Sequence, residues 1–145
     1  MILGLDPGKS GGMVLLDANS TIIDRIIFSH NTDHDIADCI REWNENDGLI
    51  AYLEQVHSMP RQGVASTFKF GAHFGMLRGM LIMAHIPFRL VTPGMWQRKL
   101  GCLSHGNKNV TKSAAQQRWP DLKWSHAFAD AALIAEYGRV TEASK

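Results

Sequence analysis

Three acidic side chains and one histidine stand where they could hold a divalent cation. Asp6 and Glu54 each follow a short apolar run, and His126 and Asp130 lie four residues apart near the end of the chain. A carboxylate at the end of a buried strand is costly to desolvate unless a cation or a hydrogen-bond donor meets it. Carboxylate oxygens suit Mg²⁺ and Mn²⁺, and two such ions about 3.5–4 Å apart can clamp a phosphodiester while one activates water. The set therefore predicts a metal site, with two ions, that hydrolyses phosphodiesters.

His126 has two candidate roles in this set, and the spacing does not choose between them. It precedes Asp130 by one helical turn, so the two side chains share a helix face. An isolated helical histidine is more often structural or exposed. Its place beside Asp130 favours a role as a metal ligand or as a proton-transfer group.

The elements that must position these side chains follow from apolar periodicity and from turn residues. Pro7-Gly8 and Gly11-Gly12 separate two apolar runs, which predicts a strand, a tight turn and a second strand. Thr32 and Ser125 are candidate helix caps, and Pro93 is typical of a first helical position. The expected order is three strands (2–5, 13–16, 21–28), a helix (32 to about 46), a strand (49–53), a helix (64–85), a strand (87–91), and helices starting at 92, 110 and 126.

This order predicts an α/β fold with a mixed five-stranded sheet flanked by helices on both faces. Three strands form an antiparallel meander, and two more are parallel. If the first and fourth strands lie side by side, Asp6 and Glu54 meet at the same edge of the sheet. Binding sites tend to lie at such an edge, beyond the carboxyl ends of parallel strands.

The longest predicted helix carries a repeated glycine. Gly71, Gly75 and Gly79 recur every four residues, and each costs about 1 kcal/mol inside a helix relative to alanine. Three of them on one face need a reason. We expect close approach of another backbone, either that of the sheet or that of a second subunit.

The composition is that of one globular domain covering residues 1–145. Apolar residues make up 45% of the chain and charged residues 20%. The chain starts directly with a strand and has no apolar stretch of bilayer length, so we expect no signal peptide and no membrane contact. Cys39 and Cys102 lack metal-type spacing and are expected to be free thiols in a reducing compartment.

Charge is distributed unevenly along the chain. Residues 1–55 carry three basic and ten acidic side chains, a formal charge of −7, whereas residues 56–145 carry twelve and four, a charge of +8. A basic half is compatible with a nucleic-acid surface, although a solvated exterior gives the same count.

A phosphate-binding loop is an alternative interpretation of residues 4–10, and it fails on spacing. Such loops need four residues between their glycines, but only three separate Gly4 from Gly8. Asp6 within the turn would also repel a phosphate unless a cation intervened.

Five segments together are similar to a known family: ILGLDPGKSGG, YLEQVHSMPRQG, FGAHFGMLRG, TPGMWQRKLG and SHAFADAALIAEYG. Their order and spacing resemble those of the RuvC-type Holliday-junction resolvases, most of all the compact phage and organelle-related branch. The resemblance runs over nearly the whole chain. It implies an RNase H-like fold, a homodimer, and Mg²⁺- or Mn²⁺-dependent cutting of two symmetric strands of a four-way DNA junction. It also implies the cytoplasm as the compartment, in a bacterial host cell if the chain comes from a phage.

By this resemblance, Asp6, Glu54 and Asp130 match the metal-binding acids of the family, and His126 matches the fourth position. Bacterial members have that residue three before the last acid, whereas here the gap is four. Bacterial members also have a phenylalanine three residues after the glutamate, where this chain has His57. The candidate DNA-binding residues are Lys9, His57, Arg61, Gln62, Lys69, Arg98, Lys99, Lys108 and Lys112, of which Lys108 and Lys112 are the plausible counterparts of the family's catalytically helpful basic residues.

Three other functions stay open at this stage. Because histidine stacks on bases more weakly than phenylalanine, His57 favours a broader endonuclease that cuts forks and flaps with little sequence preference. A junction-binding protein without catalysis is a second alternative, although retention of all the acids argues against it. An RNase is the third, since recognition of a 2′-hydroxyl leaves no clear trace in a sequence.

Overall fold

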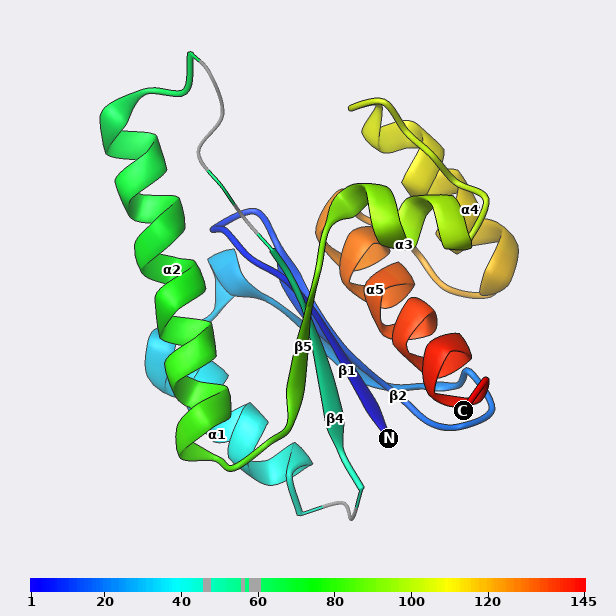
Figure 1. Ribbon diagram of the computed structural model, residues 1–145, viewed down its shortest axis with the longest axis horizontal. Helices are drawn as coiled ribbons and strands as arrows, with labels where there is room; N and C mark the ends of the chain where they lie inside the picture. Colours follow the sequence, from blue (N-terminus) through cyan, green and yellow to red (C-terminus); the bar gives the residue numbers. More distant parts are fainter. Residues whose placement is uncertain (46–47, 56, 58–60) are drawn as a thin grey trace.

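A five-stranded mixed sheet forms the centre of the molecule (Figure 1). The computed structural model describes residues 1–45, 48–55, 57 and 61–145. The first three strands form an antiparallel meander, and the last two run parallel to the first, so the predicted sheet is confirmed. The strand order is β3-β2-β1-β4-β5, with β1 (Ile2–Asp6), β2 (Gly12–Leu16), β3 (Ile22–Ile27), β4 (Ile50–Glu54) and β5 (Phe88–Val91).

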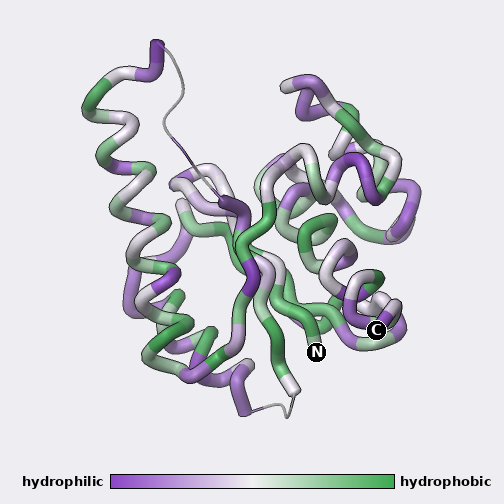
Figure 2. Tube along the Cα trace, in the orientation of Figure 1, coloured by the Kyte–Doolittle hydropathy of each residue, from purple (hydrophilic) through white to green (hydrophobic). Residues whose placement is uncertain are grey.

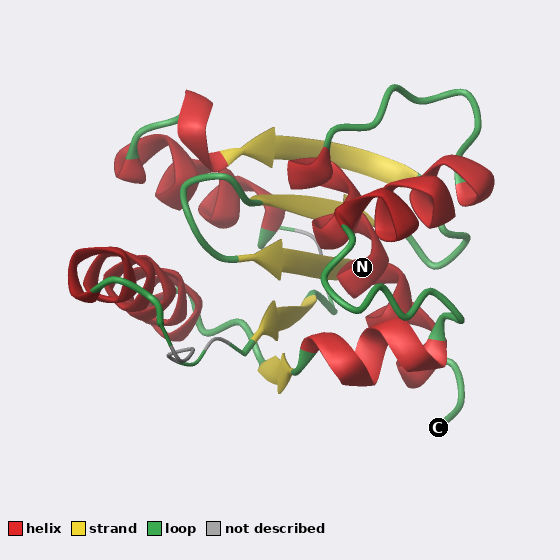
Figure 3. Ribbon diagram, turned by 90° about the horizontal axis from the view of Figure 1, so that it is seen from above, coloured by secondary structure: helices red, strands yellow, loops and turns green. Residues whose placement is uncertain are grey.

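Helices cover both faces of this sheet (Figure 3). One face packs against the first two helices and the other against the last three, with a separate apolar core on each side. No helix of the described chain has the length and apolar character needed to cross a bilayer. The helices are α1 (Asp33–Trp43), α2 (Val64–Met83), α3 (Pro93–Lys99), α4 (Lys108–Arg118) and α5 (His126–Glu142), and a short 3₁₀ turn, η1, spans Phe28–His30.

The alternation of side chains along β1 decides which face receives the first acid. Leu3 and Leu5 belong to the core under α1 and α2, whereas Ile2 belongs to the core under α5. Gly4 lies on the α5 face too, because a Cβ there would come within 2.2 Å of the Ala131 carbonyl oxygen. Since the side-chain period of a strand is two, Asp6 also faces α5. Figure 2 shows the apolar strands that carry these cores, in green at the centre of the molecule.

The helix starts follow the capping residues of the sequence, with one difference. Thr32 and Asp35 form a reciprocal capping box on α1, and the Ser125 hydroxyl accepts from the Phe128 amide at the start of α5. The helix expected from residue 110 begins earlier, at Lys108, because the Asn107 side chain caps it by accepting from the Asn109 amide. This earlier start places Lys108 in the first turn of α4.

The repeated glycines of α2 do not contact the sheet. A Cβ built at Gly71, Gly75 or Gly79 meets no atom within 4 Å. We expected this face to pack against either the sheet or a second subunit. The expectation that it packs against the sheet is therefore wrong. The face is open to solvent.

Candidate active site at the carboxyl end of the sheet

Three acids from distant segments converge at one end of the sheet. β1 and β4 are adjacent and parallel, with Leu5 opposite Leu53, so their next residues, Asp6 and Glu54, sit together at the carboxyl ends of the strands. Asp130 comes from α5, the helix that packs across β1 and β2. The negative charges of Glu54 and Asp130 both raise the pKa of Asp6, so the three carboxylates interact electrostatically.

Asp6 is the most enclosed member of this set. Its side chain sits at 8% exposure beneath α5. Burial raises its pKa well above the usual range, and repulsion from Glu54 and then Asp130 raises it further. Lys108 acts in the opposite direction but is the weakest of the four causes. In the protein without a cation, Asp6 therefore holds its proton far more tightly than a free aspartate does.

Glu54 is held in place by a tryptophan that the sequence reasoning missed. The indole Nε1 of Trp96, on α3, donates a hydrogen bond of 2.8 Å to Glu54 Oε2. Trp96 itself is 1% exposed, so this donor is fixed by packing. Burial raises the pKa of Glu54 to about 7, while the Trp96 hydrogen bond pulls it down and the charge of Asp130 pushes it up. The signal available in the sequence was the position of Trp96 one turn into a helix started by Thr92-Pro93.

The two carboxylate oxygens of Asp130 differ in their surroundings. Its Oδ1 is buried and has no hydrogen-bond partner, whereas Oδ2 lies 3.9 Å from the Lys108 ammonium. Burial raises the pKa of Asp130, and the Thr111 hydroxyl, Lys108 and His126 each lower it. A buried carboxylate oxygen without a donor is uncommon and needs an explanation, such as an ion.

His126 lies at the first position of α5, on the surface. It is close enough to Asp130 for its charge to lower the pKa of that acid. The structure thus brings together three of the four candidate ligands as an inner group, with the histidine at their rim.

The carboxylate oxygens of these acids are the ligand type that a hard divalent cation prefers. The unpartnered Asp130 Oδ1 and the mutual repulsion of the acids are both relieved by a positive charge. Within the described residues, no group of three or more His, Cys, Asp or Glu side chains is arranged so that it could hold a metal ion. Mg²⁺ typically keeps several waters and takes one or two carboxylates plus substrate oxygens, so an open set of acids suits it.

The candidate DNA-binding residues divide into three groups. Lys108 pairs with Asp130, and Lys9, Gln62 and Lys69 line one pocket beside the turn that follows Asp6. No contact described in the structure joins the remaining candidates to the acids. These are His57, Arg61, Arg98 and Lys99, which are exposed, and Lys112, which is half-buried on α4.

Comparison with known proteins supports the fold. No protein-family model matches the sequence, and no curated protein does. Among solved structures, Thermus thermophilus RuvC in complex with a Holliday junction substrate superposes with a TM-score of 0.70 at 16% identity, covering 98% of this chain and 94% of that one. A second Thermus thermophilus RuvC structure gives a TM-score of 0.60 at 16% identity, covering 99% and 96%. These neighbours have an RNase H-like fold, so the predicted fold class is confirmed.

Proposed function

We propose that this chain is a metal-dependent endonuclease that resolves four-way DNA junctions by paired, symmetric phosphodiester hydrolysis. The observation that carries the proposal is the convergence of Asp6, Glu54 and Asp130 at one end of the sheet. One buried and two half-buried carboxylates that repel one another are costly for a fold to keep unless a cation uses them. The RuvC neighbour was solved with a Holliday junction substrate, and the fold shared along 98% of this chain supports the same class of substrate here.

The residues of the chain divide the work as follows. Asp6, Glu54 and Asp130, with His126 as a fourth candidate, would hold Mg²⁺ or Mn²⁺, and such ions activate water and stabilise the leaving oxygen of a phosphodiester. Trp96 fixes the rotamer of Glu54 through its 2.8 Å hydrogen bond. Lys108 partly neutralises Asp130 and is near enough to contact a phosphate bound there. His126 lies at the exposed rim, as a ligand or as a proton-transfer group.

A second copy of the chain is part of the proposal, because paired cuts need two sites. The open glycine face of α2 continues into apolar side chains at both ends, with Phe68 at 76% exposure and Ile82 at 56%. Residues 68, 71, 75, 79 and 82 follow helical spacing and share one face. Glycines let two helices approach closely, so this face suits an α2–α2 contact in a homodimer.

A DNA substrate also bears on the compartment. In a bacterial host cell, DNA lies in the cytoplasm, and we propose that the protein acts there. This holds for a chain of phage origin as well.

The test is cleavage of a synthetic four-way junction in Mg²⁺ and in Mn²⁺, with products mapped at nucleotide resolution. Asp6→Asn is expected to lower the rate at least about 100-fold, because it removes a ligand from the centre of the site. Asp38→Asn is the matched control, since Asp38 is exposed on α1 and forms a surface ion pair with Arg41. Undiminished cleavage by the Asp6 variant would rule the proposal out.

A broader branched-DNA endonuclease is the second candidate, favoured by one observation. His57, where the resembling family has a phenylalanine, is exposed three residues after the end of β4 and is weaker than phenylalanine as a stacking group. Side-by-side cleavage of junction, fork and plain duplex separates the two. Equal rates on junction and fork would favour the broader enzyme.

A further inference from the structure

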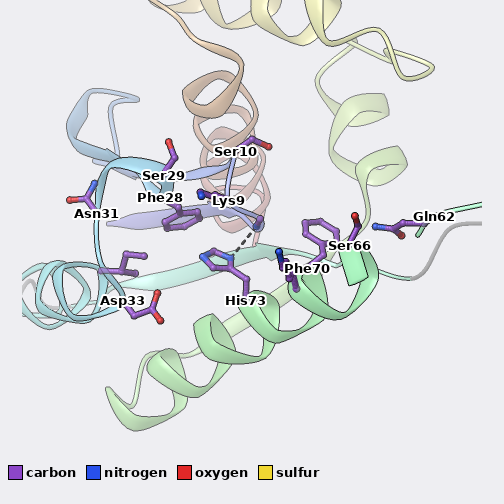
Figure 4. A pocket seen from close by; sticks show the side chains of 13 residues that line it. Lys9, Ser10, Phe28, Ser29, Asn31, Asp33, Gln62, Ser66, Phe70 and His73 are labelled. Atoms are coloured by element: carbon purple, nitrogen blue, oxygen red, sulfur yellow. Dashed lines mark hydrogen bonds between the residues drawn. The ribbon is translucent and has the colours of Figure 1, made fainter. Parts of the chain in front are cut away.

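A pocket of about 870 Å³ lies on the sheet face opposite the acids (Figure 4). Its walls come from three segments: the turn 8–10, the stretch 28–36, and the first turns of α2 with the residues just before it, 62–73. Phe28 and Ile36 belong to the core under α1 and α2, which places the pocket on that face. The turn after Asp6 therefore lies between two sites, with the carboxylates on one side and this pocket on the other.

Aromatic rings form the apolar part of the pocket. The rings of Phe28 and His73 meet edge to face with centroids 4.8 Å apart. The Phe70 ring packs on the turn, since a Cβ at Gly8 would come within 2.7 Å of it. Figure 4 shows Phe28, His73 and Phe70 in the middle of the pocket, between Asn31 and Asp33 at one end and Gln62 and Ser66 at the other.

The polar lining is mostly cationic or neutral. Lys9 and Lys69 line the pocket with two positive charges, and both residues are exposed. Asp33 is the one acid among the described lining residues. Serine hydroxyls and the Asn31 amide add hydrogen-bonding groups from all three segments.

His73 connects this pocket to the turn that carries Asp6. The backbone amide of Gly8 donates a 3.0 Å hydrogen bond to His73 Nδ1. Burial lowers the pKa of His73, so the ring is neutral and Nε2 carries its proton. This hydrogen bond fixes the turn to α2. The Phe70 ring, also on α2, packs against the same turn. A ligand against these rings would thus be held at a defined distance from the acids.

We infer that this pocket binds one unstacked nucleotide of the DNA strand being cut, next to the scissile phosphate. The base would lie against Phe70 and His73, and its phosphate would meet Lys9 and Lys69. Enzymes that read or process single bases combine these features, an aromatic slot with hydrogen-bonding groups and a cationic edge. That the nucleotide belongs to the cleaved DNA strand rests on the proposed function. That the pocket binds a nucleotide does not.

Two simpler ligands fit the lining less well. An inorganic phosphate needs only the lysines and leaves the aromatic rings unused. An apolar molecule leaves the two lysines and the hydroxyls unused. Pockets of roughly 300–1,000 Å³ suit ligands larger than phosphate, and a nucleotide uses both parts of this one.

The direct experiment is a ¹⁵N–¹H NMR titration of the whole chain with dCMP, with dAMP and with inorganic phosphate, without metal. Each nucleotide is expected to shift the amide signals of Gly8, Lys9 and His73 saturably. Ser66→Trp, which fills the pocket from an exposed helix position, is expected to weaken this binding about tenfold. Lys69→Glu is a second variant with the same expectation. Arg41→Glu, an exposed charge reversal on α1, should bind like the parent chain.

Three outcomes would overturn the inference. They are the absence of saturable shifts, identical shifts in the filled variant, and an equal response to inorganic phosphate alone. None of these requires the chain to bind or cut a junction, so a failure of the proposed function leaves this experiment decisive.

A second experiment places the nucleotide in the substrate. Single abasic residues are introduced at successive positions around the crossover of a four-way junction, and binding is measured by fluorescence anisotropy in EDTA. One abasic position should weaken the parent chain about tenfold and have no further effect on Ser66→Trp. Equal losses in both proteins at every position would contradict the inference. Junctions bound by neither protein would count against the proposed function instead.

Discussion

The two longest helices flank the sheet on opposite faces and are buried to very different extents. α5 has 17 residues, of which nine are buried, including the unbroken run from Ala131 to Glu136. α2 has 20 residues, and only Leu77 and Leu81 are buried. α5 is therefore a core helix that positions Asp130, whereas α2 exposes most of its surface and touches the sheet along a narrow stripe.

Glycine shows the same contrast at the level of single atoms. A Cβ at Gly4 would lie 2.2 Å from the Ala131 carbonyl oxygen, and one at Gly138 would lie 2.5 Å from the Tyr52 ring. A Cβ at Gly75 would meet nothing within 4 Å. On the α5 side, glycine allows close packing between elements within the chain. On the α2 side, it leaves room for a contact with another molecule.

Gly4→Ala should produce the largest loss of stability. The added methyl group would collide with the backbone of α5, which cannot move without displacing Asp130. We expect the free energy of unfolding to fall by about 3 kcal/mol or more, the upper range for overpacked cores. Urea denaturation followed by circular dichroism measures it. A loss below about 0.5 kcal/mol, within the scatter of surface substitutions, would mean that the α5 packing is looser than described.

Asp6→Asn should stabilise the protein while abolishing its activity. Because the pKa of Asp6 is raised in the folded state, the fold loses stability as pH rises from the unfolded value of 3.8 through the folded one. Glu54 contributes in the same direction between 4.5 and about 7. At pH 8 in EDTA, the variant is expected to be more stable by an amount on the order of 2 kcal/mol, and this gain should shrink toward pH 4.

Urea denaturation of parent and variant at each pH from 4 to 8 measures the difference directly. Asp38→Asn serves as the control, because that exposed acid is paired on the surface of α1 and should give no comparable gain. If the Asp6 variant is less stable than the parent at pH 8, the acids do not destabilise the metal-free fold by repulsion.

Trp96→Phe should weaken metal binding without disturbing the core. Phenylalanine keeps an aromatic ring in the buried slot and removes the N–H that donates to Glu54 Oε2. The Mg²⁺ concentration for half-maximal cleavage is expected to rise about tenfold, as for other residues that orient metal ligands. Trp124→Phe is the matched control, since that indole is also buried but donates to the Trp119 carbonyl oxygen. An equal metal requirement in both variants would reduce Trp96 to a packing residue.

Most of the fold was predictable because it depends on local patterns. The strand β1 ends where Asp6 follows its apolar run, and the capping box at Thr32 starts α1 as expected. The start of α4 was not predicted correctly, because apolar periodicity begins at Val110 whereas the cap is supplied by Asn107. The alternation of strands and helices also predicted a three-stranded meander with two parallel strands, whereas the pairing of β1 with β4 entered the prediction only as a condition.

The partners of the site residues were less predictable, because they come from tertiary packing. Asp6, Glu54 and Asp130 stood out as acids at the ends or faces of apolar elements. Nothing local in the sequence links Trp96 to Glu54, or His73 to the Gly8 amide, since each pair meets only after helices dock on the sheet. For the glycines of α2, the regular spacing was clear from the sequence, but the sequence did not show which surface they would contact.

The smallest effect belongs to α2, and its sign depends on what covers that face. In a chain whose α2 face is open, Gly75→Ala should stabilise the helix by up to about 1 kcal/mol, because alanine is the better helix former and the methyl group meets nothing. Where two copies pack through this face, the same methyl group separates the helices and the gain disappears at high protein concentration. Gly75→Arg extends the argument, since a long charged side chain should prevent the contact while leaving the helix intact. Sedimentation velocity is expected to find the parent chain dimeric and Gly75→Arg monomeric. If Gly75→Arg is still dimeric, the subunit contact lies elsewhere than on α2. If the stability gain of Gly75→Ala does not depend on protein concentration, no second copy packs on this face.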